Sequence, residues 1–326
     1  MMSEQNNTPL PVFSHTSVLL DEVITGLVVS SGGIYLDATL GGAGHASAVL
    51  SAAGPEAELV GLDQDTYALE AAQQRLQSFA EKGQKIHLCK SNFRDVDRVL
   101  RGYYGEPRPL LAGALFDLGV SSPQLDMEDR GFSYWGDAPL DMRMDTDQPL
   151  TAADILASYS VQEMTRIFRE FGEERWAARI AAMIVQRRAT EPIVRSDQLV
   201  EVIKQAIPAA ARREGGHPAR RCFQALRIAV NDELGVLESA LQAVIPWLSI
   251  GGRFAVISFH SLEDRVVKHT IQHAENPCTC PPGYPCVCGL VPTLRRITRK
   301  PIVASADELE KNPRARSAKL RIAERV

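Results

Sequence analysis

The chain has 326 residues, 45% of them hydrophobic and 23% charged, with a formal net charge of −4 and a sequence pI of about 6.0. These are ordinary globular values, so one large α/β domain with an insertion, or two modest domains, can bury a sizeable core. The strongly basic balance that marks many nucleic-acid-binding proteins is absent, so any contact with RNA must use local basic patches.

The tail and the cysteines indicate the cellular compartment. Residues 1–13 are polar and lack the basic and apolar regions of an export signal, so we expect a disordered tail. No stretch reaches the roughly 18 apolar residues needed to span a bilayer, so no membrane partner is expected. Six cysteines, two scattered and four in one short stretch, do not resemble a disulfide framework. We therefore predict a cytoplasmic protein with reduced thiols.

The first part of the chain alternates short apolar runs with helical patterns. The stretch from His15 to Leu27 predicts a helix with Thr16 or Ser17 as its N-cap. Strands are then expected over 34–40, 59–63, 86–89 and 113–118, and helices over 46–53, 67–79 and 96–103. Strands separated by helices predict a parallel sheet with right-handed crossovers.

This alternation stops after Gly119. From 124 to 214 the pattern indicates loops and helices, most clearly helices over 173–188 and 196–206. The α/β pattern resumes with a helix over 219–245, a strand over 253–259, a helix over 262–273 and a strand over 319–323. We predict one discontinuous α/β domain over 14–123 and 215–326, interrupted by a helical substrate-binding domain over 124–214.

A glycine-rich turn lies between the first predicted strand and the next helix, in the segment 37–45. Glycines such as Gly44 let the backbone approach a ligand closely, and the following helix offers free N–H groups. Asp63 closes the next strand, where an acid can accept hydrogen bonds from a ribose diol. A dinucleotide site typically has the motif G-x-G-x-x-G/A, and here Ser47 takes the place of its third glycine. A structural turn, a dinucleotide site and an adenosyl-ligand site all remain open on this segment.

A second motif, Asp117-Leu-Gly-Val-Ser-Ser-Pro-Gln124, follows the fourth predicted strand. In open α/β sheets the loops after the strands meet in one crevice, so Asp117 should face Gly44 and Asp63. Enzymes that methylate nucleobase amines use an acidic or polar residue and a proline here. A carboxylate that accepts hydrogen bonds from the amine N–H groups localises the lone pair of the amine nitrogen. The main catalytic effects are then orientation and electrostatics. The candidate catalytic residues are Asp117, Ser121, Ser122 and Pro123.

The chain resembles the bacterial 16S ribosomal RNA cytosine-N4-methyltransferases of the MraW (RsmH) type over nearly its whole length. The matching stretches, in order, are HTSVLLDEV at His15, GGAGH at Gly41, DLGVSSPQLD at Asp117, RGFSYWGDAPLDMRMD at Arg130, FGEERWAARIA at Phe171, HPARRCFQALRIAVNDEL at His217, ISFHSLEDRVVK at Ile257 and NPRARSAKLRIAER at Asn312. The family often has an arginine at the position of Gly42. The glycine in this chain loosens the loop but removes none of the carboxylates expected to contact the ligand.

This resemblance implies a Rossmann-like class I methyltransferase fold that uses S-adenosyl-L-methionine. The implied substrate is the N4 amine of a cytosine in the 16S rRNA of the small ribosomal subunit, in the decoding centre near the P site. The residues implied at the methyl-donor site are Ala43, Gly44, His45, Asp63, Phe93, Asp117 and Gln124. Each has an ordinary alternative: Asp63 or His45 can simply cap backbone, and Phe93 can simply pack in the core.

Aromatic and basic residues suggest where RNA binds. Phe132, Tyr134 and Trp135 beside an arginine suit the stacking of an unpaired base, although they also fit a hydrophobic hinge between two lobes. Arginines cluster around 212–227 and 295–316 and can neutralise phosphates, or can form an ordinary solvated surface. Further candidate substrate residues are Arg143, Arg220, Arg221 and His260. We expect Ser261 to act chiefly as a helix N-cap.

Four cysteines crowd into a Cys/Pro-rich loop over 276–292. Cys278, Cys280, Cys286 and Cys288 can supply four thiolates to a structural zinc ion. However, the C-x-C spacing is tighter than the usual C-x2-4-C, and reduced thiols in a loop fit the pattern as well. Neither interpretation gives this loop a catalytic role.

Overall fold

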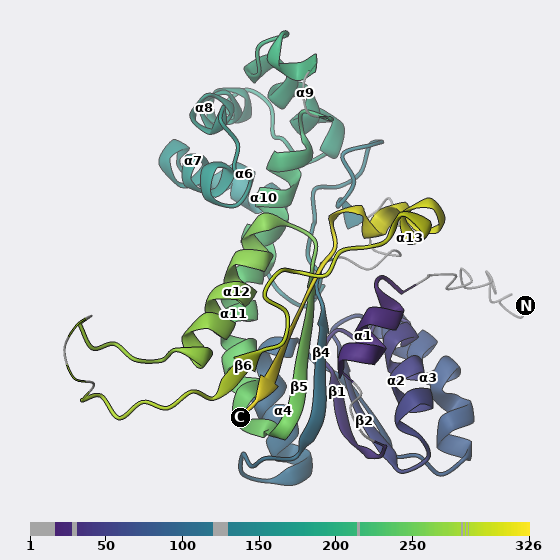
Figure 1. Cartoon of the computed structure of the whole chain (residues 1–326). Helices are drawn as coiled ribbons and strands as arrows, with labels where there is room; N and C mark the ends of the chain where they lie inside the picture. The colour runs from purple at the N-terminus through teal and green to yellow at the C-terminus, as the bar shows by residue number, and fades with distance from the viewer. Residues whose placement is uncertain are drawn as a thin grey trace, which may run out of the picture.

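The computed structural model describes residues 17–27, 31–119, 130–213, 216–281, 283, 285 and 287–326. Within them, seven strands form one sheet in the order β3-β2-β1-β4-β5-β7-β6 (Figure 1). Neighbours from β3 to β5 are parallel, whereas β7 runs antiparallel to both β5 and β6. The strands are β1 Gly33–Asp37, β2 Ala57–Asp63, β3 Ile86–Lys90, β4 Leu111–Asp117, β5 Leu248–Ser258, β6 Leu294–Arg296 and β7 Lys319–Arg325.

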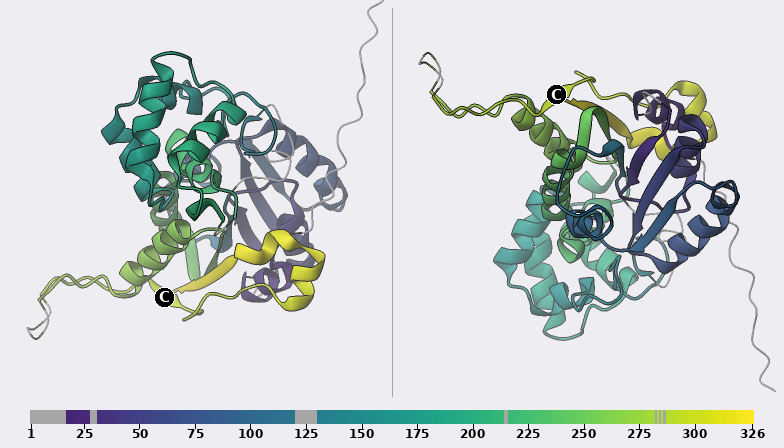
Figure 2. Two further views of the ribbon diagram at one scale, coloured as in Figure 1. Left: turned by 90° about the horizontal axis from the view of Figure 1, so that it is seen from above. Right: turned by 90° about the horizontal axis from the view of Figure 1, so that it is seen from below.

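Helices cover both faces of the sheet, because the central strands are apolar on both sides. One face carries α1 Leu20–Leu27, α2 Gly44–Ala53 and α3 Thr66–Glu81, and the other carries α4 Val96–Tyr104, α11 Glu233–Val244 and α12 Ser261–Glu275. Trp247 and Phe116 are fully buried on the second face. A short helix, α13 Ala306–Lys311, lies beside α1 (Figures 1 and 2). The predicted mostly parallel α/β sheet is confirmed.

A lobe of helices stands at one end of the sheet and has its own hydrophobic core (Figure 1). It contains α6 Ala152–Ser158, α7 Val161–Glu170, α8 Ala177–Arg188, α9 Ser196–Ala206 and α10 Arg220–Asn231. Capping boxes start two of these helices: Thr151 pairs with Asp154, and Ser160 pairs with Glu163. These caps fix where the two short helices begin.

The predicted single helix over 219–245 is wrong, because the chain breaks it at Asp232. Asp232 adopts a left-handed conformation with φ of 49° and separates α10 from α11. Phe223 and Leu226 of α10 are buried in the core of the lobe, while Leu237 of α11 is buried against the sheet. We therefore propose that the insertion ends at Asp232 rather than at 214.

Two predicted helix starts are also wrong. The first helix begins at Leu20 rather than near His15, after Leu19 with φ of 53°, and Ser17 does not cap it. His15, Thr16 and the tail 1–13 lie outside the described residues. The N-cap of α12 is His260, whose Nδ1 accepts from the Glu263 N–H, and Ser261 is the first helical residue. None of the described helices is long and apolar enough to cross a membrane.

Candidate functional site

Three aspartates end three neighbouring strands on the same edge of the sheet. Asp37 ends β1, Asp63 ends β2 and Asp117 ends β4. In the strand register Asp37 lies opposite Gly61 and Leu115, so the other two acids each extend two residues further. Asp37 is 3% exposed, and burial raises its pKa to about 7 despite the nearby His45. Asp37 is not among the residues that the sequence motifs predict for the site.

A cavity of about 470 Å³ lies beyond these strand ends, between the sheet and the helical lobe. It brings together Gly44, Asp63 and Asp117, as the sequence motifs predicted. Other residues around it are Ser17, His45, Phe93, Phe132, Tyr134, Arg220, Phe223, Arg227, Glu233, His260, Glu263 and Arg314. A second depression of about 820 Å³ lies beside α3 and β3 and is lined by none of the three aspartates. The chemistry therefore points to the smaller cavity.

The glycine turn forms one wall of the cavity. Gly41 has φ of 49°, and its N–H donates to Asp63 Oδ2 at 2.8 Å. Ala43, fully buried and also left-handed with φ of 58°, precedes α2 without forming a side-chain cap. A Cβ atom at Gly44 would lie 2.1 Å from Ser17 Oγ, so the wall is closely packed. The turn presents backbone rather than side chains to the cavity.

Asp63 holds the base of this turn. Besides Gly41, its carboxylate accepts from the Asp65 N–H through Oδ1 at 2.8 Å. Burial raises its pKa to about 6, although these backbone donors act in the opposite direction. The side chain therefore organises the loop and still lines the cavity, where an acid is suited to a hydroxyl or cationic ligand group.

His45 connects the turn to Asp117. Its Nε2 atom donates to the Val18 carbonyl oxygen at 2.9 Å, and its Nδ1 atom lies 3.5 Å from Asp117 Oδ2. Because a carbonyl oxygen can only accept, a neutral His45 carries its proton on Nε2 and turns a lone pair toward Asp117. Burial lowers the pKa of His45, which favours this neutral form.

Asp117 is the least satisfied acid of the cavity. Its side chain is 22% exposed, and its Oδ1 atom is buried and has no hydrogen-bond partner among the described residues. Burial, with the nearby charge of Glu263, raises the pKa of Asp117 to about 7. Its own N–H donates to Thr39 Oγ1 at 2.6 Å, which fixes the end of the strand. Asp117 can therefore accept a hydrogen bond from a ligand.

Below Asp117, buried charges neutralise one another. Arg227 donates to both carboxylate oxygens of Glu233 at 2.8 Å and lies 3.9 Å from Glu263. Burial acts to raise the pKa of Glu263, but His260 and Arg227 outweigh it and lower that pKa. His260 Nε2 lies 3.0 Å from Glu263 Oε1 without hydrogen-bond geometry. His260 lines the cavity, as predicted, and also caps α12.

Four predicted aromatic residues lie at or near the cavity. Phe93 lines it and packs edge-on against Phe116, with ring centroids 6.0 Å apart. Phe132 and Tyr134 line it from the lobe side, and Phe132 also belongs to the core of the lobe. Trp135 does not line the cavity and is 68% exposed.

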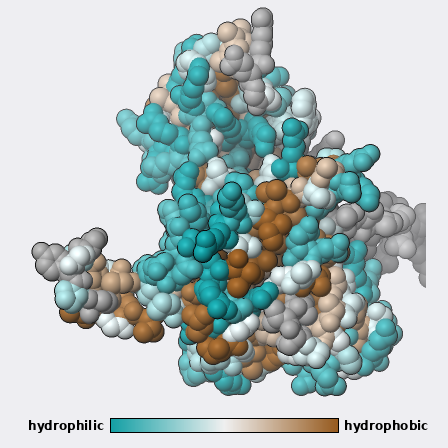
Figure 3. Space-filling view, viewed as in Figure 1, coloured by the Kyte–Doolittle hydropathy of each residue, from teal (hydrophilic) through white to brown (hydrophobic). Residues whose placement is uncertain are grey.

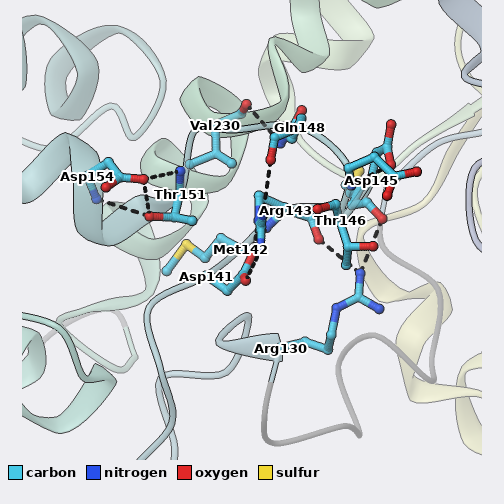
Figure 4. Close-up of polar contacts among 12 residues, drawn as sticks. Arg130, Asp141, Met142, Arg143, Asp145, Thr146, Gln148, Thr151, Asp154 and Val230 are labelled. Atoms are coloured by element: carbon cyan, nitrogen blue, oxygen red, sulfur yellow. Dashed lines mark hydrogen bonds and ion pairs between the residues drawn. The ribbon is translucent and has the colours of Figure 1, made fainter.

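The predicted arginines separate into two groups. Arg220 lines the cavity, whereas Arg221 points elsewhere and donates to the Glu173 carbonyl oxygen at 3.3 Å. Arg143 is held in its own loop: it pairs with both oxygens of Asp141 at 2.8 Å and donates to two carbonyl oxygens (Figure 4). Arg143 is thus occupied in shaping the loop. Ser121, Ser122, Pro123 and Gln124 lie outside the described residues.

The comparisons with known proteins decide the family. A model of the MraW methylase family matches residues 12–326. The chain belongs to the MraW methylase family. A relative from Symbiobacterium thermophilum is 53% identical over 314 residues, covering 95% of this chain and 96% of the relative. A relative from Heliobacterium modesticaldum is 52% identical, covering 97% of this chain and 99% of the relative. Both are named ribosomal RNA small subunit methyltransferase H.

Family membership and the sheet order confirm the predicted Rossmann-like class I methyltransferase fold. The chain is a methyltransferase, and the methyl donor of this class is S-adenosyl-L-methionine. The cavity fits that group, which carries a positive sulfonium and a positive amino group. Asp63 and Asp117 line it with acidic side chains, and Asp117 Oδ1 has no hydrogen-bond partner in the described structure. A dinucleotide would instead place its anionic pyrophosphate against these acids.

Proposed function

We propose that this MraW-family chain transfers the methyl group of S-adenosyl-L-methionine to the exocyclic N4 of a cytosine in 16S rRNA. The proposed target lies in the decoding centre of the small ribosomal subunit, near the P site. The observation that carries the proposal is the carboxylate of Asp117, which has one buried oxygen without a partner among the described residues and lies in a cavity lined by the glycine turn. The names of the two relatives support the substrate class.

Residues of the turn would hold the methyl donor. Gly44, which lets the turn pack closely on Ser17, lines the cavity at the first turn of α2, and Asp63 would accept hydrogen bonds from the ribose. Phe93 on the rim offers a face for adenine. His45, which also lines the cavity, lies beside Asp117, with its Nδ1 atom 3.5 Å from Asp117 Oδ2. When bound, the donor supplies an electrophilic methyl group on a sulfonium.

Asp117 would act on the amine. The N4 lone pair of cytosine is delocalised into the ring, which makes the amine a poor nucleophile. An ionised Asp117 that accepts an N–H bond pulls the nitrogen toward tetrahedral geometry and localises this lone pair. Ser121, Ser122, Pro123 and Gln124 follow directly in the sequence, and we assign them to the same step as substrate and donor contacts.

The lobe would present the base. A cytosine must leave its stack to reach a carboxylate inside this cavity, and aromatic side chains stabilise unstacked bases. Tyr134 stacks on His217 at 4.6 Å with an interplanar angle of 11°, and Trp135 lies 4.7 Å from the same ring. Arg220 on the cavity wall can neutralise a phosphate. Arg143 and Arg221, which are engaged elsewhere, enter only as supports of the loops.

The experiment is methyl transfer to small subunits purified from cells that lack this chain. We expect tritiated methyl from S-adenosyl-L-methionine to appear in 16S rRNA as one N4-methylcytidine, located by mass mapping. Asp117→Asn should abolish nearly all incorporation while retaining the fold. Methylation on another atom or another RNA contradicts the proposed target, and equal transfer by Asp117→Asn contradicts the mechanism. Parallel incubation with isolated 16S rRNA tells whether the assembled subunit is required.

A further inference from the structure

An arm of the chain projects from the body between α12 and β6. Figures 1 and 2 show its two legs running side by side away from the sheet and the lobe. The base is closed by the Thr293 N–H, which donates to the Ala274 carbonyl oxygen at 2.8 Å. The described part of the arm contributes to none of the hydrophobic clusters of the body. Its conformation must therefore be stabilised within the arm.

Apolar packing does not provide that stability. Val287 is 87% exposed and Val291 is 71% exposed, and Leu290 is half-exposed. Figure 3 shows apolar side chains lying open along the arm. Ordering about 15 residues costs on the order of 1–2 kcal/mol each in backbone entropy, so an arm without a core needs another source of stability. A cross-link between the legs is such a source.

Three thiols meet across the two legs. Cys278 and Cys280 lie on the outgoing leg and Cys288 on the returning leg, and their Sγ atoms all lie within 4.8 Å of one another. Three sulfurs around one tetrahedral ion with Zn–S bonds of about 2.3 Å would be about 3.8 Å apart. Small side-chain rotations close that difference. The Val287 N–H also donates to Cys280 Sγ at 3.4 Å, a contact that stabilises a thiolate.

A disulfide accounts for this arrangement less well. No disulfide joins the cysteines in the described part of the chain, and a single disulfide would use only two of the three converging sulfurs. A second set of ligand atoms, from Glu233, His260 and Glu263, lies in the cavity of the sheet. There the guanidinium of Arg227 already neutralises the carboxylates, so a cation gains little. The thiol cluster is therefore the site with metal-binding chemistry.

We propose that Cys278, Cys280 and Cys288 bind one Zn²⁺ ion as thiolates and that this ion ties the two legs of the arm together. Each thiol releases its proton to the solvent when its sulfur binds the metal. The fourth cysteine predicted as a ligand, Cys286, lies outside the described residues, so the proposal rests on the other three thiols. The site is structural, since it lies on the arm and shares no residue with the cavity around Asp117.

The test uses the full chain, reduced, freed of metal by a chelator and then incubated with Zn²⁺ before gel filtration. We expect about one equivalent of zinc to remain with the protein. Cys280→Ser and Cys288→Ser should each weaken binding at least tenfold, measured by competition with a chromophoric chelator. Cys89→Ser removes a thiol elsewhere, on β3, and should bind zinc like the unmodified chain. Co²⁺ in place of Zn²⁺ should give the visible absorption of a tetrahedral thiolate site.

Three results overturn the proposal. The first is zinc retention by Cys280→Ser equal to that of the unmodified chain, and the second is no retention by either protein. The third is peptide mapping of zinc-treated protein kept under nitrogen that shows Cys280 and Cys288 joined in a disulfide. Thermal unfolding of the body serves as the folding control, because the arm lies outside the hydrophobic clusters and the cysteine variants should unfold at the same temperature.

Discussion

His45 Nδ1 lies 3.5 Å from Asp117 Oδ2, so the first helix after the glycine turn directly contacts the acid at the end of β4. Since Nε2 of this histidine donates to Val18, the pair has room for one proton between Nδ1 and Oδ2. A proton on Asp117 makes this contact a hydrogen bond, and its loss leaves a carboxylate facing a lone pair. The protonation state of Asp117 therefore determines whether His45 can bond to it, and it also bears on the proposed chemistry.

The rate of methyl transfer should depend on pH through Asp117. Its pKa is raised to about 7, and the proposed mechanism needs the ionised form. We expect kcat/KM to rise with pH and level off above about 8, falling about tenfold per unit on the acid side. Asp117→Asn should abolish this acid-side dependence on pH, and its rate at pH 8 should be about 10²–10³-fold lower. If kcat/KM of the variant depends on pH as it does in the unmodified chain, the titrating group is not Asp117.

The stability of the ligand-free protein should carry a pH signature of Asp37. Its folded pKa of about 7 lies above the ordinary value of 3.8, so the folded state holds a proton that the unfolded state has lost. Asp37 therefore costs stability progressively as pH rises from about 4 to about 7. Asp37→Asn should gain stability relative to the unmodified chain over that window, with the difference fading below pH 4. Urea unfolding at several pH values measures it, and a constant difference contradicts the assignment.

Gly44→Ala should damage the wall of the cavity. The added Cβ would lie 2.1 Å from Ser17 Oγ, which costs about 1–3 kcal/mol and shifts the turn away from the ligand. Ser17→Ala removes the clashing oxygen, so the double variant should recover most of the stability and of the affinity for S-adenosyl-L-methionine. Gly102→Ala is the matched control: it lies in α4 with no atom within 4 Å and should gain about 0.5–1 kcal/mol. Failure of the double variant to recover refutes the steric explanation.

Trp135→Ala should separate RNA binding from folding. The side chain is 68% exposed, so its loss should change stability by less than about 0.5 kcal/mol. Loss of one base-stacking contact should raise the KM for the small subunit about tenfold and leave kcat unchanged. Tyr67→Ala removes another exposed aromatic ring, on α3 away from the cavity, and should leave KM unaltered. Equal KM values for the unmodified chain and both variants would show that Trp135 does not contact the RNA.

Sequence patterns predicted the central strands of the sheet well because β1, β2 and β4 are apolar runs that end in aspartate. Asp63 and Asp117 follow such runs directly, and the rule that strand ends share one crevice then located the cavity. The break at Asp232 was missed because it contains neither glycine nor proline and lies within a continuous helical pattern. Only tertiary packing, with α10 on the lobe and α11 on the sheet, requires the left-handed residue there.

Other details depend on partners that are distant in the sequence. Strand β6 has three residues and exists through its pairing with β7, so no local pattern announces it. The cap at His260 is unusual for a histidine, although Glu263 three residues later was a usable capping-box signal. Arg143 and Asp141 are two residues apart and oppositely charged in the sequence. Their pairing could therefore have been expected, and it argues against an arginine that is available to bind RNA.

Strand β7 lies between β5 and β6 although it follows both in the chain. During synthesis the parallel strands β1 to β5 can assemble first, while β6 has to wait for residues 319–325 to leave the ribosome before it gains its partner. Until then one side of β5 stays open as an unpaired edge, a template for pairing with other chains. Newly synthesised copies of this protein are therefore prone to aggregate at this edge until β7 pairs with β5.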